Sequence, residues 1–360
     1  MKVGVIGSGL AGLSACWYAS KFARVDILEK EAGVGIDAHS VDARFEGGRR
    51  VRIDTPLRVL KAGYYPGLLR LYEASRIPTE IIDYSGSFCD AGRAPYFRYR
   101  NLIVGEKSYA FITNAFSLAR PGRRILRDIF RFYGSGRKHL RGPETRSMNF
   151  GEYLEAFGYS EEFRDRFILP LFAAINTCGY AAVKEYPAAT LVDYLVNSRN
   201  PSGVRRISGG VANVAQTLSR AAEDIQCAAA VHQIEQKDHR VVVSTSAGRF
   251  VYDYVVISTQ ANQAARFCER SLPRHRDLLS RFRYEKSELV VHKDLNFMPR
   301  TRSAWSPVNF IVDPAFQKPM VTIYMNAIQR ELRSEEAILQ TWNPHSLPAP
   351  DLTLAHSAFE

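Results

Sequence analysis

The first residues constrain the fold of this 360-residue chain more than any other segment. A short apolar run, Lys2–Ile6, leads into the hexapeptide GSGLAG at residues 7–12. An apolar run that ends at glycine is typical of a buried strand, and the region from Leu10 to about Phe22 has the character of a helix with small residues on one face. Arg24–Glu29 is predicted to be a second strand. Together these segments predict a β-α-β unit that opens an α/β domain.

The hexapeptide matches the G-x-G-x-x-G fingerprint, in which each glycine has a physical role. Gly7 permits a tight turn, and Gly9 lets a pyrophosphate approach the free amides at the helix N-terminus, where the helix dipole favours negative charge. Gly12 lets the helix pack closely on the strand. Glu29, 20 residues after Gly9, can accept hydrogen bonds from ribose hydroxyls and disfavours a 2′-phosphate, which argues against NADP. The alternative is a glycine turn that binds no ligand.

The rest of the chain has a mostly helical middle part and a later part in which β-α patterns return. After a predicted hairpin at Glu46–Asp54, helices are expected at 66–75, 107–133, 149–157, 160–169 and 187–197. From about residue 204, a helix that ends near Ala222 precedes expected strands at 225–235, 239–245, 249–258, 283–292 and 320–326. The α/β unit is therefore interrupted by a second domain.

The composition favours an anionic partner. The chain has 48 Lys and Arg against 37 Asp and Glu, a formal net charge of +11. A phosphate-bearing cofactor, an acidic lipid surface and nucleic acid would each explain this excess, but no DNA- or RNA-binding motif accompanies it, so we expect no nucleic-acid partner. The 5 cysteines are scattered, which predicts free thiols and a cytoplasmic protein.

A basic stretch at 120–141 is open to two interpretations. Several of its apolar residues recur at helical spacing: Ile125, Leu126, Ile129, Phe130 and Phe132. They could pack a helix on the core with its basic face in solvent, or they could mediate a peripheral contact with an anionic membrane.

Several ordered motifs resemble those of the flavin-containing amine oxidases. The similarity is closest to the amine-oxidase-like FAD-binding oxidoreductases of bacteria, fungi and algae. The motifs are VGVIGSGLAG at 3–12, VGIDAHS at 34–40, IDTPL at 53–57, YPGLLRL at 65–71, ILPLFAAI at 168–175, RFRY at 281–284, MPR at 298–300, AW at 304–305, YMN at 324–326 and NP at 343–344.

The resemblance implies FAD as cofactor and a path along which FAD is bound. The pyrophosphate would lie on Gly7, Ser8, Gly9, Leu10, Ala11 and Gly12, and the adenosine ribose on Glu29 and Lys30. Gly35 and Ser40 would continue toward the flavin, Val231 would contact adenine, and Thr259 would be a second dinucleotide contact. The resemblance implies no metal site, and we assign no catalytic residue because the flavin carries the chemistry.

The expected architecture is α/β, with a discontinuous Rossmann-type FAD-binding domain and an inserted α+β substrate domain. We assign 1–60 and 200–285 to the FAD domain, 61–199 and 286–345 to the substrate domain, and 346–360 to a C-terminal tail. The resemblance implies a further flavin-contact segment past the last shared motif. We expect this segment to be missing here, so that the chain is either a fragment or has an open flavin site. The expected substrate is an apolar small molecule or lipid that gives up a hydride. Its binding wall is expected to include Tyr64, Tyr65, Phe97, Tyr99 and Phe172.

Departures from the family pattern leave a non-catalytic alternative open. Ile36 and Asp37 replace a glycine and a basic residue or histidine, and Pro56 replaces the glycine of a D-T-G motif, which removes a backbone donor near the flavin. Glu288 lies near the position of a lysine that amine oxidases often use. A flavin- or nucleotide-binding sensor or assembly partner without turnover is therefore the second hypothesis.

Overall fold

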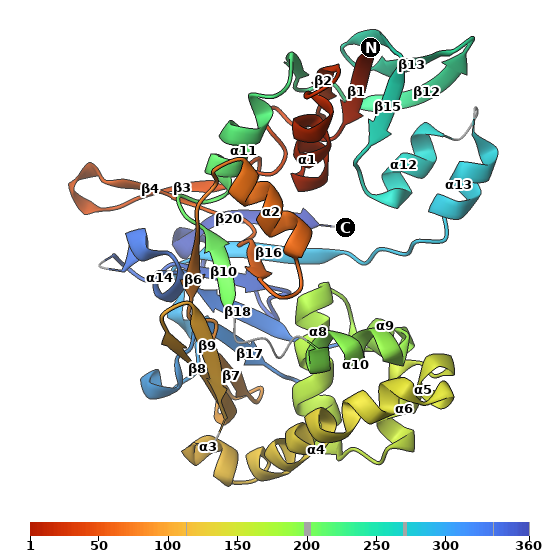
Figure 1. Cartoon of the computed structure of the whole chain (residues 1–360). Coiled ribbons are helices and arrows are strands. Elements are labelled where there is room, and N and C mark those ends of the chain that lie inside the picture. Colours follow the sequence, from red (N-terminus) through yellow and green to blue (C-terminus); the bar gives the residue numbers. More distant parts are fainter. Residues whose placement is uncertain (113, 198–202, 269–271, 334, 360) are drawn as a thin grey trace.

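The computed structural model describes residues 1–112, 114–197, 203–268, 272–333 and 335–359. It has a dinucleotide-type domain at one end, a large mixed sheet in the middle and a group of helices at the other end (Figure 1). The predicted class, an α/β Rossmann-type domain with an α+β insertion, is confirmed. Residue 200, where we expected the first domain to resume, lies outside the described residues.

A parallel four-stranded sheet forms the centre of the dinucleotide-type domain. Its order is β11 (Asp224–Gln226), β2 (Arg24–Leu28), β1 (Lys2–Ile6) and β15 (Tyr254–Ile257). Helices α1 (Leu10–Ala19) and α11 (Val211–Ser219) pack together in the same hydrophobic cluster as the apolar residues of β1 and β2. The strands predicted at 2–6 and 24–29 and the helix that follows the glycines are therefore confirmed.

Residues far apart in the sequence complete this domain. An antiparallel sheet of β12 (Val231–Lys237), β13 (Arg240–Thr245) and β14 (Gly248–Tyr252) packs beside β1, and the ring of Tyr252 lies against Gly4. Helices α12 (Ala261–Phe267) and α13 (Pro273–Leu279) follow β15. The domain is thus discontinuous in sequence, as the interrupted pattern predicts.

An eight-stranded mixed sheet is the largest element of the insertion. Its order is β20 (Thr353–Phe359), β16 (Ser287–His292), β19 (Leu339–Trp342), β18 (Met320–Tyr324), β17 (Val308–Ile311), β7 (Gly86–Cys89), β8 (Pro95–Val104) and β9 (Lys107–Phe111). Only β17 and β7 run parallel in it, and the other neighbours are antiparallel.

Two smaller sheets lie between the two domains. One is the hairpin of β3 (Val41–Arg44) and β4 (Arg50–Ile53), and the other has the order β5 (Val59–Lys61), β10 (Val204–Ile207) and β6 (Thr79–Ile82). The short helical elements of this region and of the large sheet are η1 (Glu46–Gly48), α2 (Pro66–Ala74), η3 (Leu295–Phe297), η4 (Arg302–Ala304), α14 (Met325–Ile328), η5 (Arg330–Leu332) and η6 (Pro350–Leu352).

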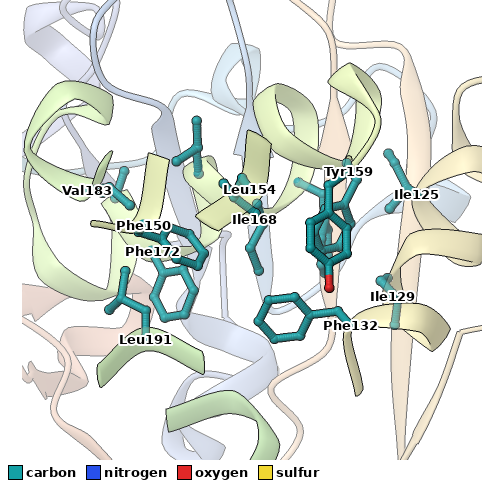
Figure 2. Packing of buried hydrophobic residues seen from close by; sticks show 14 of the residues in the cluster. Ile125, Ile129, Phe132, Phe150, Leu154, Tyr159, Ile168, Phe172, Val183 and Leu191 are labelled. Carbon is teal, nitrogen blue, oxygen red and sulfur yellow. The ribbon is translucent and has the colours of Figure 1, made fainter. Parts of the chain in front are cut away.

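The helical group packs around a core rich in aromatic side chains (Figure 2). It consists of α3 (Ala115–Leu118), α4 (Gly122–Arg141), α5 (Pro143–Ser147), α6 (Phe150–Ala156), α7 (Glu161–Phe163), the π-helix η2 (Arg164–Ile168), α8 (Leu169–Asn176), α9 (Tyr180–Glu185) and α10 (Ala188–Asn197). On α4, Ile125, Ile129 and Phe132 are buried in this core, whereas Phe130 is exposed. The apolar face of the basic stretch is therefore used for core packing.

Two expectations about secondary structure are wrong. Residues 107–111 form β9 rather than the start of a helix, and the middle part contains four strands, β6 to β9, that the helical patterns did not predict. The segment 346–360, which we assigned to a C-terminal tail, contains β20, and β20 pairs with β16. Its alternating burial is typical of a strand with one face on the core.

In the described ranges of the chain, none of the helices combines the length and the apolar character that crossing a bilayer requires.

Candidate functional site

An open cavity of about 510 Å³ lies where the parallel strands of the dinucleotide-type domain end. The carboxyl ends of such strands are the usual ligand-binding edge of an open α/β sheet, and the volume is in the range of small-molecule sites. The cavity is lined by Ile6, Gly7, Gly9, Leu28, Glu29, Lys30, Glu31, Gly35, His39, Ala229, Ala230, Val231, His232, Ser258, Thr259, Gln263, Arg266 and Phe267.

The three glycines of the hexapeptide have the geometry that an anion-binding turn requires. Gly7 has φ +92°, a left-handed conformation that favours glycine. A Cβ on Gly12 would lie 1.9 Å from the Gly7 carbonyl oxygen, so only glycine lets α1 pack this closely. A Cβ on Gly9 would meet nothing within 4 Å. The backbone beside Gly9 is therefore open to a ligand at the N-terminus of α1.

The Glu29 carboxylate is ordered by Ser8. Glu29 is 4% exposed, and its Oε2 accepts hydrogen bonds from the Ser8 backbone amide at 2.7 Å and from the Ser8 hydroxyl. The same hydroxyl accepts a hydrogen bond from the Gly35 amide at 2.6 Å. Glu29 Oε1 accepts only the Glu31 amide, at 3.0 Å, among the described contacts, which leaves it capacity to accept a further hydrogen bond.

Five of the predicted contact residues do not line the cavity. Ser8 is fully buried behind its wall, and Leu10, Ala11 and Gly12 form the first turn of α1. The Leu13 amide is bonded to the Gly9 carbonyl at 3.0 Å, so the amides that precede it are the ones a helix leaves without a partner. Ser40 lies farther along the chain, where its hydroxyl accepts the Thr55 amide at 3.5 Å.

The other predicted contacts meet around the cavity from distant segments. Gly7, Gly9, Glu29, Lys30, Gly35, Val231 and Thr259 all line it. Val231 begins β12 directly after Ala230, whose amide donates to the Ser246 hydroxyl at 3.0 Å. Thr259 follows β15, and its methyl group would lie 3.2 Å from a Cβ on Gly7.

The sequence analysis missed several cavity residues. Arg266 and Gln263, from α12, and His232, from β12, carry no motif of their own. Gln263 and Arg266 reach the cavity because the chain continues from Thr259 into α12, and His232 reaches it because β12 begins at the cavity. His39, within the VGIDAHS motif, also lines the cavity, and its ring makes an edge contact with Phe359 at 5.1 Å between centroids.

The residues on the expected flavin side are fixed by buried contacts. Asp54 is 3% exposed and its Oδ1 accepts the Val211 amide at 3.0 Å, at the N-terminus of α11. Burial raises the pKa of the Asp54 carboxyl above its ordinary value. Ile36, in place of a family glycine, is buried in the core, and Asp37 forms an ion pair with Arg52 at 2.8 Å.

Glu288 and the expected aromatic wall can also be located. Glu288 is exposed on β16 and lies 3.4 Å from the imidazole of His356 on β20. Phe97 and Phe172 are buried in the aromatic core, so they belong to its packing rather than to an open wall. Tyr64 and Tyr65 are 45% and 42% exposed, and Tyr64 makes an edge contact with Tyr194 at 4.8 Å between centroids.

In the ranges that the structure describes, no group of His, Cys, Asp and Glu side chains has an arrangement that could hold a metal ion. The five cysteines are free thiols, and all but Cys227 are buried.

Comparisons with known proteins agree with this geometry. The family profile of NAD(P)-binding Rossmann-like domains matches residues 5–75. No curated protein sequence matches the chain.

Solved structures share the fold over nearly the whole chain at low sequence identity. An oxidoreductase from Methanosarcina mazei has a TM-score of 0.67 at 12% identity and covers 100% of this chain and 88% of its own. Putrescine oxidase bound to putrescine has a TM-score of 0.64 at 15% identity, and the match covers 95% of this chain and 76% of the putrescine oxidase chain. A CLA-producing fatty acid isomerase from P. acnes has a TM-score of 0.63 at 17% identity, and the match covers 96% of this chain and 77% of the isomerase chain. The chain therefore shares the fold of these three proteins.

Proposed function

We propose that this protein is an FAD-dependent oxidoreductase that removes a hydride from an apolar small molecule or lipid-like substrate. The observation that carries the proposal is the open space over Gly9, at a helix N-terminus, in a cavity that also contains the Glu29 carboxylate. The oxidoreductase fold and the ordered motif resemblance support it.

The residues of the cavity fit the two ends of an adenosine diphosphate group. The amides around Gly9 would bind the pyrophosphate, because they lie at the positive end of the α1 dipole. Glu29 Oε1 would accept a ribose hydroxyl, and the start of β12 at Val231 would offer its backbone to adenine. Gly35 and Ser40 would extend the path toward the flavin. Bound FAD would supply the hydride acceptor, while this chain binds, orients and excludes water.

Flavin content after purification tests the proposal. We expect a yellow protein with flavin absorption, and Gly9→Asp should abolish cofactor retention because its carboxylate would occupy the pyrophosphate position. Gly67→Asp is the matched control, since a Cβ on Gly67 also meets nothing within 4 Å and Gly67 lies in the first turn of α2, outside the cavity. Equal flavin content in both folded variants would contradict the assignment.

The second candidate is a flavin-binding protein without turnover. It is favoured by Pro56, which cannot donate a backbone hydrogen bond, and by the acidic Glu288 where amine oxidases often have lysine. Anaerobic mixing of the flavin-loaded protein with amines, fatty acids and terpenoids separates the two candidates. Bleaching of the flavin absorption by one of these classes supports the oxidoreductase, and a spectrum unchanged by all of them supports the non-catalytic protein.

A further inference from the structure

The hairpin of β8 and β9 exposes an apolar sheet face at the edge of the large sheet. Residues Leu102 and Tyr109 are paired across the two strands, and Leu102 is 62% and Tyr109 47% exposed. Val104, at 59%, and Phe111, at 57%, lie on the same face, because side chains two residues apart on a strand point to the same side. Four large apolar side chains are thus in solvent together.

Cations flank this apolar face. Arg100 is paired with Phe111 at one end of the hairpin, and Val104 with Lys107 at the other, so both cations share the face. Arg100 and Lys107 are exposed, and in the described residues no carboxylate forms an ion pair with either. Glu106, in the turn between the two strands, forms an ion pair with Arg205.

The segment that follows the hairpin also exposes apolar and cationic side chains. Helix α3 packs on β8 and on the start of α4, and its Leu118 is 59% exposed. Arg120 and Arg123 follow it and are also exposed. In Figure 1, α3 and α4 lie at the end of the molecule that is remote from the dinucleotide-type domain, and the hairpin lies in the middle part at the edge of the large sheet.

We propose that this face, formed by Arg100, Leu102, Val104, Lys107, Tyr109 and Phe111, docks the protein on an anionic phospholipid surface. Exposed apolar side chains gain free energy when they enter the headgroup region, tyrosine is suited to that interface, and each cation near an anionic surface adds to the attraction. A second copy of this chain is a poorer occupant, because the face has cations and no acid, and pairing two such faces would place like charges together.

Flotation with two kinds of vesicle tests the docking. The full chain should float with vesicles of phosphatidylcholine and phosphatidylglycerol, should float far less with phosphatidylcholine alone, and should be released by high salt. Replacing both cations, Arg100→Gln with Lys107→Gln, should weaken binding to the anionic vesicles by about 25-fold, or about fivefold for each charge, and should leave binding to neutral vesicles unchanged.

A double variant that removes apolar side chains from the hairpin tests their part in docking, and a matched double variant elsewhere controls for the loss of exposed apolar surface. Leu102→Ser with Phe111→Ser should reduce anionic-vesicle binding by about tenfold or more at an unchanged melting temperature. Val251→Ser with Tyr254→Ser removes side chains that are 49% and 63% exposed on the other domain, and it should bind like the unaltered protein.

Three results would overturn the proposal. One is equal flotation with neutral and anionic vesicles, and another is unaltered binding in both hairpin variants. The third is a dimer, seen by sedimentation, that dissociates in the apolar hairpin variant while no protein floats.

A fluorescent reporter tests the contact of the hairpin with the vesicle directly. Tyr109→Trp should show a blue-shifted emission only with anionic vesicles, and emission unaffected by them contradicts insertion.

Discussion

Ser8 holds Glu29 through two hydrogen bonds, one from its amide at 2.7 Å and one from its hydroxyl. Ser8 was expected to contact the pyrophosphate, yet its side chain is buried and joins the Glu29 carboxylate to the Gly35 amide. Ser8 therefore acts in the structure by positioning Glu29 and the loop after it.

Ser8→Ala should weaken both the fold and cofactor retention. It removes a buried hydroxyl and leaves the Gly35 amide without its partner, which costs about 1–3 kcal/mol in the free energy of unfolding. Flavin retention should fall as Glu29 loses its orientation. Chemical denaturation and flavin absorbance measure the two effects. Ser14→Ala is the control, since the Ser14 hydroxyl only donates to the Leu10 carbonyl within α1, and a loss as large there would contradict the explanation.

Substitution by alanine should lower stability at Gly12 but cofactor affinity at Gly9. Gly12→Ala would place a Cβ 1.9 Å from the Gly7 carbonyl oxygen, so we expect a loss of about 3 kcal/mol or more in unfolding free energy. Gly9→Ala meets no atom within 4 Å and should leave the melting temperature nearly unchanged while lowering cofactor affinity. Thermal melts of the cofactor-free proteins decide this, and equal melting temperatures would contradict it.

Stability should fall in mild acid because of His292. The imidazole is fully buried, its Nδ1 accepts the Asp294 amide at 3.1 Å, and Nε2 donates to the Thr341 hydroxyl at 2.8 Å. Burial lowers the pKa of His292 to about 4 against an opposing effect of Asp294, whereas the unfolded chain has the ordinary value of about 6.5. The unfolded state therefore binds more protons between these values, and stability is complete above pH 6.5 and declines toward pH 4.

The size of this effect is about 3 kcal/mol over that range of pH. His292→Gln can still donate to Thr341 but cannot titrate, so its unfolding free energy should change less between neutral pH and pH 4. Urea titrations at several pH values measure the difference. Parallel pH profiles for the two proteins would show that His292 does not carry the effect.

Asp128 should be a sensitive polar position of α4. It is fully buried and accepts the amide and hydroxyl of Ser160, at 2.9 and 2.6 Å. Burial alone would raise the pKa of the Asp128 carboxyl, but the hydrogen bonds from Ser160 and the cations of Arg127 and Arg131 lower it. Asp128→Ala should cost about 2–4 kcal/mol of unfolding free energy. Asp277→Ala, which removes an exposed ion pair, should cost under about 1 kcal/mol, and a similar loss in both would contradict this account.

The parts of the fold that sequence predicts are those with local signals. The glycine turn, the strands beside it and the helices of the middle part follow from short-range patterns. The strands from β6 to β9 were missed because their burial does not alternate regularly: Tyr96 and Phe97 are adjacent and both buried. One signal was present, since Gly105, with φ +58°, begins a two-residue turn between β8 and β9.

The residues of the cavity also fall into those that a local motif marks and those that only tertiary packing brings there. Gly7, Gly9 and Glu29 belong to one continuous motif and could be placed from it. Arg266 and His232 become neighbours of that motif only through tertiary packing, so no local pattern marks them. Position alone could not show that Ser8 faces the interior, since this depends on its partners Glu29 and Gly35.

The discontinuous sheet also has a consequence for the order of assembly during synthesis. The Lys2 amide donates to Asp253 Oδ2 across a separation of 251 residues, and β1 pairs with β15 at the same distance along the chain. One wall of the cavity ends at His39 and the other begins at Ala229. A ribosome must therefore deliver residues 1–229, nearly two thirds of the polypeptide, before the opposite wall of the cavity begins to be made, and until then the glycine turn has no opposite wall.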